Sequence, residues 1–115
     1  MANQIVHFEI AGKSKEVLES FYTALFDWKI QEAMPGYSLV QPGAGIGGGI
    51  GTMGGASYVT FYVQVVSVEG TLATAEAHGA TKLFGPHVIP DGATIAAFSD
   101  PEGHVIGILQ PAPGM

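Results

Sequence analysis

The sequence predicts an α+β fold in which two β-α-β-β-β modules make up one domain over residues 1–115. The main observation is an internal duplication, because residues 5–64 and 58–109 follow the same plan. Each copy opens with an alternating strand, continues into a helical segment and ends in a run of short strands. A repeat of roughly fifty residues with this plan cannot bury its apolar faces alone, so two copies must pack or pair. We therefore expect the functional site in a concave face that the two copies make together.

The first module is expected over residues 3–54 and opens with a strand at residues 5–10. Ser14 is suited to cap a helix, because its hydroxyl can accept from a backbone N–H of the first turn. Apolar residues then recur at helical spacing, namely Val17, Leu18, Phe21, Tyr22 and Leu25. Strands are predicted next over residues 28–33, 37–41 and 46–53.

The second module is expected over residues 57–112 and opens with a strand at residues 58–63. Ser67 is the predicted helix cap and Gly79 the predicted helix end. Three residues are expected to face inward from this helix: Leu72, Ala73 and Ala77. Strands are predicted over residues 81–84, 94–98 and 104–109, with turns marked by Pro86, by residues 90–92 and by residues 100–103.

The glycine-rich tract at residues 43–55 supports two interpretations. Glycine loses much conformational freedom on ordering and offers no side chain for packing. The tract is either a strand with mobile flanks that closes over the cleft as a flap, or a flexible connector between the two modules.

Strand alternation divides each opening strand into two faces. We expect the apolar rows to pack under the helices; these are Val6, Phe8 and Ile10, and Val59, Phe61, Val63 and Val65. The mixed rows would then line the concave face. They contain Ile5, His7 and Glu9 in the first strand, and Tyr58, Thr60, Tyr62 and Gln64 in the second.

The composition argues against polyanionic partners. The chain has 10 acidic residues and only 4 basic ones, all of them lysine, so its formal net charge is −6. Nucleic acids and anionic membranes are bound by clustered basic side chains, which this chain lacks. It also has no apolar run long enough to cross a bilayer and no signal-peptide pattern, so we expect a cytoplasmic protein. The absence of cysteine excludes disulfides, thiolate metal sites and thiol catalysis.

Residues 98–108, with the sequence FSDPEGHVIGI, resemble the closing hairpin of the vicinal oxygen chelate superfamily. This superfamily includes glyoxalase I, bleomycin-resistance proteins and extradiol dioxygenases, and an Asp-Pro-acid-Gly turn joins the last two strands of its β-α-β-β-β module. Residues 6–10, 21–22, 26–28 and 47–49 more narrowly resemble the bacterial branch related to lactoylglutathione lyase. The resemblance covers nearly the whole chain and implies that the two modules form a concave mixed sheet.

The resemblance also implies a divalent metal site, with one ligand from the opening strand and one from the closing strand of each module. At these positions only His7 retains a ligand type. Thr60 takes the matching place on the second opening strand, while residues 47–49 and Gly107 take those on the closing strands. A threonine hydroxyl is a poor ligand, and glycine offers none.

A second argument against this metal site does not depend on the resemblance. The sequence has no Asp, Glu or His between Glu32 and Glu69, and none after His104. Catalytic transition-metal sites typically use about three imidazole or carboxylate ligands. We therefore predict no family-type metal site and no cofactor, and a divalent metal is the disfavoured alternative.

His7 and Glu9 are the candidate catalytic residues. An imidazole titrates near neutrality and can act as a general base, and a neighbouring carboxylate can hold it in place. Alternatively, His7 is a hydrogen-bonded relic of the ancestral metal position and Glu9 a solvated carboxylate. The candidate ligand-binding residues form an aromatic wall with hydrogen-bonding groups, suited to a planar organic ligand: Tyr58, Thr60, Tyr62 and Gln64. The alternative for this surface is burial against a second subunit.

Three functions are consistent with these features. The first is a small-molecule-binding, glyoxalase-like protein without the standard metal site and with no assigned reaction. The second is a metal-dependent lyase or isomerase resembling glyoxalase I, although the lack of arginine removes the preferred clamp for the carboxylates of a glutathione adduct. The third is a drug-sequestering protein of the bleomycin-resistance type. In each case we expect a homodimer, because modules in this superfamily pair within or between chains.

Overall fold

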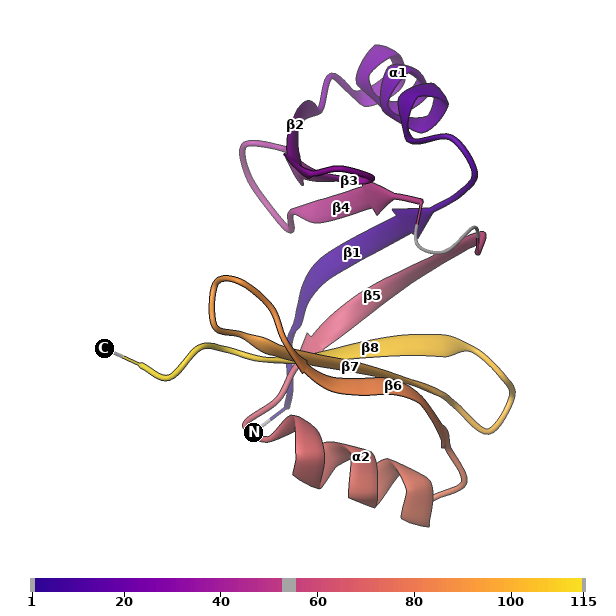
Figure 1. Ribbon diagram of the computed structural model, residues 1–115, viewed down its shortest axis with the longest axis vertical. Helices are drawn as coiled ribbons and strands as arrows, with labels where there is room; N and C mark the ends of the chain where they lie inside the picture. The colour runs from indigo at the N-terminus through magenta and orange to yellow at the C-terminus, as the bar shows by residue number, and fades with distance from the viewer. Residues whose placement is uncertain (1, 53–55, 115) are drawn as a thin grey trace. The chain divides into compact units, whose positions relative to one another are not determined.

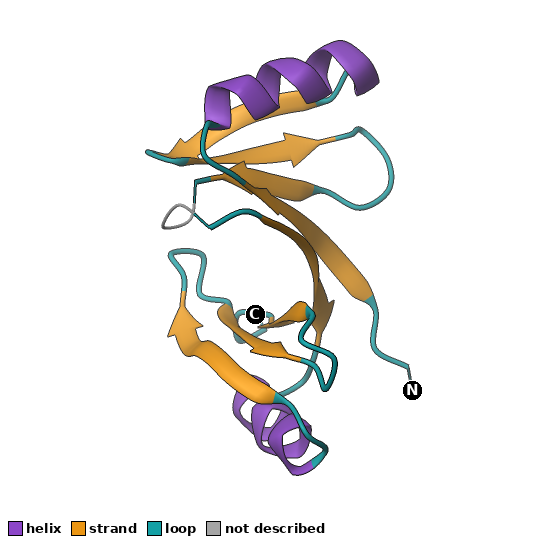
Figure 2. Ribbon diagram, turned by 90° about the vertical axis from the view of Figure 1, so that its right-hand side faces the viewer, coloured by secondary structure: helices purple, strands orange, loops and turns teal. Residues whose placement is uncertain are grey.

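The computed structural model of the chain describes residues 2–52 and 56–114. Its contacts divide the chain into two compact units (Figures 1 and 2). The amino-terminal unit is Val6–Phe61, and the carboxy-terminal unit joins Met1–Ile5 to Tyr62–Met115. Each unit has one helix against one face of its own sheet, as the duplication predicts. No helix in these described ranges is both long and apolar enough to span a membrane.

The amino-terminal unit contains the first β-α-β-β-β module. Its elements are β1 (Ile5–Ala11), α1 (Lys15–Phe26), β2 (Lys29–Met34), β3 (Tyr37–Gln41) and β4 (Gly48–Gly51). The strands lie in the order β2-β3-β4-β1. β1 and β4 are parallel, whereas β4 with β3 and β3 with β2 are antiparallel. The strand that closes the module therefore lies beside the strand that opens it.

The carboxy-terminal unit repeats this topology. Its elements are β5 (Tyr58–Gln64), α2 (Val68–Ala77), β6 (Thr81–Val88), β7 (Thr94–Ser99) and β8 (Val105–Gln110), and β5 begins in the amino-terminal unit. The strand order is β5-β8-β7-β6, with β5 and β8 parallel and the other two pairs antiparallel. The predicted pair of β-α-β-β-β modules is confirmed.

Most predicted element boundaries agree with the structure within a residue or two, but two do not. The predicted turn at Pro86 is wrong, because β6 continues through it to Val88. A proline lacks the N–H of a sheet ladder and is tolerated at a sheet edge; β6 is that edge, and its register against β7 shifts twice. The strand predicted over residues 46–53 is shorter, since β4 covers residues 48–51 and residues 42–47 form a loop. Met53 lies outside the described residues.

Both predicted helix caps are confirmed. The Ser14 hydroxyl accepts from the backbone N–H of Val17 at 3.2 Å, and the Ser67 hydroxyl accepts from that of Gly70 at 3.0 Å. Gly79 follows α2 with a φ of 101°. This left-handed conformation favours glycine and ends the helix where the sequence predicts.

The core of the carboxy-terminal unit lies between α2 and its sheet. It consists of Val65, Val68, Leu72, Ala96 and Ile108. Leu72 faces inward as predicted, but Ala73 and Ala77 are exposed. Val68 and Leu72 are four residues apart and share one helix face. Successive residues of a helix lie about a quarter-turn apart, so Ala73 points away from this face, and Ala77, four residues after Ala73, points the same way as Ala73.

Helix α1 buries only part of its apolar surface. Of the five apolar residues at helical spacing, Leu18 and Tyr22 are half-buried, whereas Val17, Phe21 and Leu25 are exposed. The face that carries Leu18 and Tyr22 also carries Lys15 and Glu19, whose side chains reach Ser38 on β3.

The apolar row of β5 is likewise only partly covered. Val59 is 73 % exposed and Phe61 36 %, while the intervening Thr60 is buried, so the prediction that both pack under a helix is wrong. Within the amino-terminal unit α1 packs mainly against β2 and β4, which leaves this side of β5 uncovered. The row continues into the carboxy-terminal unit, where Val65 belongs to the core and Val63 packs against it.

Candidate functional site

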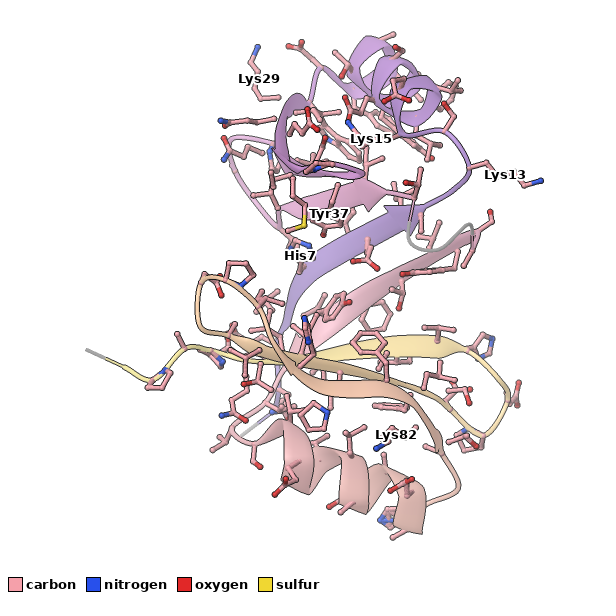
Figure 3. The ribbon with its side chains drawn as sticks, viewed as in Figure 1. His7, Lys13, Lys15, Lys29, Tyr37 and Lys82 are labelled. Atoms are coloured by element: carbon pink, nitrogen blue, oxygen red, sulfur yellow. The ribbon has the colours of Figure 1, made fainter. Side chains whose placement is uncertain are left out.

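The candidate site of the amino-terminal unit begins with a contact between His7 on β1 and Tyr37 at the start of β3. Nε2 of His7 lies 3.1 Å from the Tyr37 hydroxyl oxygen. Figure 3 shows the two side chains side by side, near the strands from which they project. Both residues are half-buried, so the imidazole has a fixed partner on one ring nitrogen while part of its surface stays accessible.

Glu9 extends this contact into a network. Its carboxylate accepts from the Tyr58 hydroxyl at 2.6 Å and, through its other oxygen, from the Tyr37 hydroxyl at 3.5 Å. The first distance is typical of a hydroxyl that donates to an ionised carboxylate, whereas the second is long and weak. Glu9 is only 4 % exposed. The site is therefore a nearly buried carboxylate that is held by the Tyr58 phenol and weakly contacted by the Tyr37 phenol, which also contacts an imidazole.

Strand geometry explains why these side chains meet. His7 and Glu9 are two residues apart on β1 and so share a sheet face. β4 pairs Glu9 with Gly49, and β3 pairs Leu39 with the same glycine. Tyr37 lies two residues before Leu39 on the same face, and a long aromatic side chain can reach such a diagonal neighbour. The phenol thus crosses β4 to reach β1.

Burial lowers the pKa of His7 from its ordinary value of 6.5. Removing water disfavours the charged imidazolium, and this is the main cause of the shift. At neutral pH the imidazole is therefore uncharged, with one ring nitrogen protonated and the other carrying a lone pair. A neutral imidazole is the form that a general base or a hydrogen-bonding ligand contact requires.

The other predicted site residues have different surroundings. The Thr60 hydroxyl donates to the backbone oxygen of Phe61 at 3.4 Å, and its side chain is buried. Gln64 is exposed, and its backbone pairs with Gln4 and with the Asn3 side chain. Tyr62 and Gln64 belong to the carboxy-terminal unit. Within the amino-terminal unit, the structure brings together three of the predicted residues: His7, Glu9 and Tyr58.

Tyr37 is the site residue that the sequence did not predict. It opens a short strand far from His7 in the chain, and only the register of β3, β4 and β1 connects the two. The sequence contained only an indirect signal. Tyr37 lies on a strand next to a strand that consists mostly of glycine, so its ring has space to cross that neighbouring strand.

The donors around His7 do not form a set suited to the metal site that the resemblance implies. Nε2 of His7 is engaged by a phenol, and Glu9 is the one carboxylate in the network. Among residues 2–52 and 56–114 no three His, Asp or Glu side chains lie close enough together to hold an ion. Since transition-metal sites typically take about three such ligands, this network lacks the chemistry of a metal centre.

A second polar cluster attaches α1 to β3. The Lys15 ammonium donates to Glu19 at 2.9 Å and to the Ser38 hydroxyl at 3.3 Å, and that hydroxyl donates to Glu19 at 2.6 Å. The hydrogen bond to Glu19 raises the pKa of Lys15, and the hydrogen bond from Ser38 lowers the pKa of Glu19. A nucleophilic serine needs an accessible hydroxyl and a neutral base. Ser38 is fully buried and Lys15 stays charged, so this cluster is structural.

An open groove of about 490 Å³ runs beside α1 and shares one lining residue, Tyr58, with the network around His7. Its walls include Val17, Leu18 and Val59, with Lys13 at its edge. Figure 3 shows Lys13 projecting away from the ribbon. The groove is largely apolar and contains neither His7 nor Glu9, so we do not assign the candidate site to it.

Comparisons with known proteins define the fold. No family model and no curated protein sequence matches the chain. Solved structures do match. A hypothetical protein from Bacillus halodurans C-125 has a TM-score of 0.73 at 15 % identity, over 100 % of this chain and 99 % of that one. The Streptomyces coelicolor methylmalonyl-CoA epimerase, in complex with 2-nitronate-propionyl-CoA, has a TM-score of 0.69 at 15 % identity over 98 % and 100 %.

A third structure, described as an NAD-dependent benzaldehyde dehydrogenase from Legionella pneumophila, has a TM-score of 0.68 at 19 % identity, over 91 % of this chain and 97 % of that one. At such identities these likenesses establish the fold and no more. The chain has the α+β, glyoxalase-like fold of the vicinal oxygen chelate proteins, built from two β-α-β-β-β modules. The narrower relation to lactoylglutathione lyase stays a prediction.

Proposed function

We propose that the protein binds a small organic ligand through the network of His7, Tyr37, Glu9 and Tyr58, without the standard metal site of the fold. The observation that carries this proposal is the nearly buried Glu9 carboxylate, which accepts a short hydrogen bond from Tyr58 and a long one from Tyr37. Ligand pockets commonly combine aromatic walls with a few fixed polar groups. Phenols, an imidazole and a carboxylate at one place supply those groups.

The chemistry of the network favours a ligand that carries a hydrogen-bond donor. A carboxylate offers about four acceptor positions, and the two phenols take two of them. The Lys15 ammonium, a buried cation of the same unit, forms an ion pair with Glu19 and not with Glu9. The remaining acceptor positions of Glu9 are therefore suited to a neutral or weakly polar ligand that carries an N–H or O–H group. A reaction at this site would be a proton transfer, with His7 as the base and Glu9 acting on it through Tyr37.

The acyl-CoA ligand of the epimerase structure is not favoured for this chain. The phosphates of coenzyme A are multiply charged anions, for which arginine and clustered lysines are the usual partners. The chain has four lysines and no arginine. Of the lysines, Lys15 is buried in an ion pair, and Lys13, Lys29 and Lys82 are exposed.

Drug sequestration is the second candidate function, favoured by a specific observation. A cationic drug would complement both the net charge of −6 and the buried Glu9 carboxylate. Cells that express the protein would then tolerate such a drug better, and the drug would be recovered unmodified. Recovery of a modified drug would exclude simple sequestration.

Metal analysis of protein purified without chelator separates the leading proposal from a glyoxalase-like lyase. We expect far less than one equivalent of Ni, Zn, Fe or Mn, and no turnover of the methylglyoxal–glutathione adduct when these ions are added. Near-stoichiometric metal that resists dialysis, together with turnover that is lost in His7→Ala, would establish the lyase instead.

We also propose that the protein is a homodimer. The exposed apolar residues of α1, which are Val17, Phe21 and Leu25, lie on one side of the helix at i, i+4 and i+8. A contiguous apolar patch of this kind commonly marks an interaction surface. A homodimer is the simplest assembly that would cover it.

A further inference from the structure

The position of the Tyr37 ring depends on a glycine on the neighbouring strand. A Cβ atom placed on Gly49 would overlap the hydroxyl oxygen and the outer ring carbons of Tyr37. The phenol therefore occupies the space that a side chain at position 49 would take. Gly49 is also the β4 residue paired with Glu9. Glycine at this position is what allows the Tyr37 hydroxyl to lie beside both His7 and Glu9.

The carboxy-terminal unit contains a related contact between different strands. Gly107 on β8 is paired with Tyr62 on β5, and a Cβ atom on Gly107 would lie 2.6 Å from the Tyr62 ring. Its counterpart in the amino-terminal unit is Phe8 on β1, whose ring lies over Gly48 on β4. Tyr37 does not belong to this repeated pairing, because it reaches Gly49 from β3.

We propose that Tyr37, lying over Gly49, is the residue that determines the specificity of this site: its hydroxyl connects His7 to Glu9 and thereby excludes a divalent cation. This inference rests on the proposed function and deepens it, because it names the residue that makes the site suited to a hydrogen-bonding ligand and unsuited to a divalent cation. The Tyr37 hydroxyl contacts His7 Nε2 and Glu9 Oε1, the two atoms through which the pair would jointly hold an ion.

The proposal also specifies the form of the imidazole. In the proposed arrangement the Tyr37 hydroxyl donates its one proton to Glu9, and its oxygen accepts from His7. His7 Nε2 then carries the ring proton, and Nδ1 carries the lone pair. Tyr37 is a positioning residue in this arrangement: it sets which imidazole nitrogen is basic.

Nitrogen NMR of the histidine side chains tests the arrangement directly, because protonated and lone-pair ring nitrogens resonate far apart. In the wild type at neutral pH we expect the Nε2–H tautomer of His7. Tyr37→Phe should shift the tautomer equilibrium of His7, whereas Tyr58→Phe, which removes the other phenol on Glu9, should change it little. An Nδ1–H tautomer in the wild type, or equal effects of the two variants, would overturn the proposal.

Cobalt binding tests the exclusion of a cation. Tyr37→Ala combined with Gly49→Glu removes the phenol and adds a carboxylate beside His7 and Glu9. We expect this double variant to bind Co²⁺ at least about tenfold more tightly than the wild type, and His7→Ala in that background to remove the gain. Tyr37→Ala alone serves as the control and should give a smaller gain, because it removes the phenol from His7 and Glu9 but adds no third ligand. Co²⁺ binding by the wild type that matches the folded double variant would refute the proposal.

Circular dichroism establishes that each variant is folded, and the tautomer measurement stands even if the double variant is not. Neither experiment uses an organic ligand. A wild type with the expected tautomer that binds no organic compound would contradict the proposed function and leave the assignment of Tyr37 intact.

Discussion

At the scale of single residues, the sequence predicts which side chains share a strand but not which distant side chain joins them. Alternation along β1 is enough to place His7 and Glu9 on one face. Tyr37 is 30 residues from His7, and its contact depends on two strand registers and on the glycine at position 49. Neither register can be derived from composition or periodicity, so the key hydroxyl of the site was not predictable.

His7→Gln should change how stability depends on pH. Burial lowers the His7 pKa below 6.5 in the folded protein. As the pH falls below that value, the unfolded chain binds the His7 proton before the folded chain does, so the free energy of unfolding decreases. The decrease runs from pH 6.5 down to the lowered pKa. Urea unfolding across this range should show a smaller loss for His7→Gln than for the wild type, and identical pH slopes would contradict the account.

Tyr58→Phe should destabilise the protein by about 1–3 kcal/mol, because it removes a short hydrogen bond to a nearly buried carboxylate. Tyr22→Phe is the matched control: Tyr22 is also half-buried, and its ring stacks on Trp28 at 5.5 Å, a contact that the substitution retains. Chemical denaturation measures both variants. Equal stabilities for the two would mean that Glu9 does not depend on the Tyr58 hydroxyl.

At the scale of elements, the sequence predicts the order of helices and strands well and their buried faces less well. The serine caps and Gly79 are local signals, and they mark the helix ends correctly. The buried face of α1 was not predictable from its apolar residues, because the buried Lys15 and the half-buried Glu19 form a satisfied polar cluster with Ser38. Their pairing depends on contact with β3, which local periodicity does not contain.

Ser38→Ala should therefore weaken the attachment of α1. Ser38 is fully buried and is hydrogen-bonded to both Lys15 and Glu19, so its loss should cost about 1–3 kcal/mol. Ser20→Ala, an exposed position on α1, provides the control and should be near neutral. Thermal unfolding of both variants measures the difference. A Ser38→Ala protein as stable as Ser20→Ala would show that the cluster does not hold the helix.

At the scale of the whole molecule, the duplication predicts the fold because the two modules are visible in the sequence as one repeated plan. Structures at 15–19 % identity share that fold and carry different descriptions. A fold common to such different proteins does not identify a reaction. The ligand must therefore be found at the site itself.

The homodimer is a testable property of the intact chain. Light scattering at micromolar concentration should give twice the chain mass of 11.9 kDa. Phe21→Glu places a charge in the exposed apolar patch of α1 and should give the monomer mass. Thr23→Glu adds the same charge at another exposed position on α1 and should remain dimeric. A monomeric wild type would remove the dimer proposal.

Native mass spectrometry of the protein, taken directly from its source without denaturation, tests the central claim most directly. We predict an adduct with the mass of a small organic compound and with no metal ion. That adduct should be lost or reduced in His7→Ala and in Tyr58→Phe, and it should persist in Tyr22→Phe. A chain that carries only a stoichiometric metal, or an organic adduct that both site variants retain, would contradict the assignment of ligand binding to the network of His7, Tyr37, Glu9 and Tyr58.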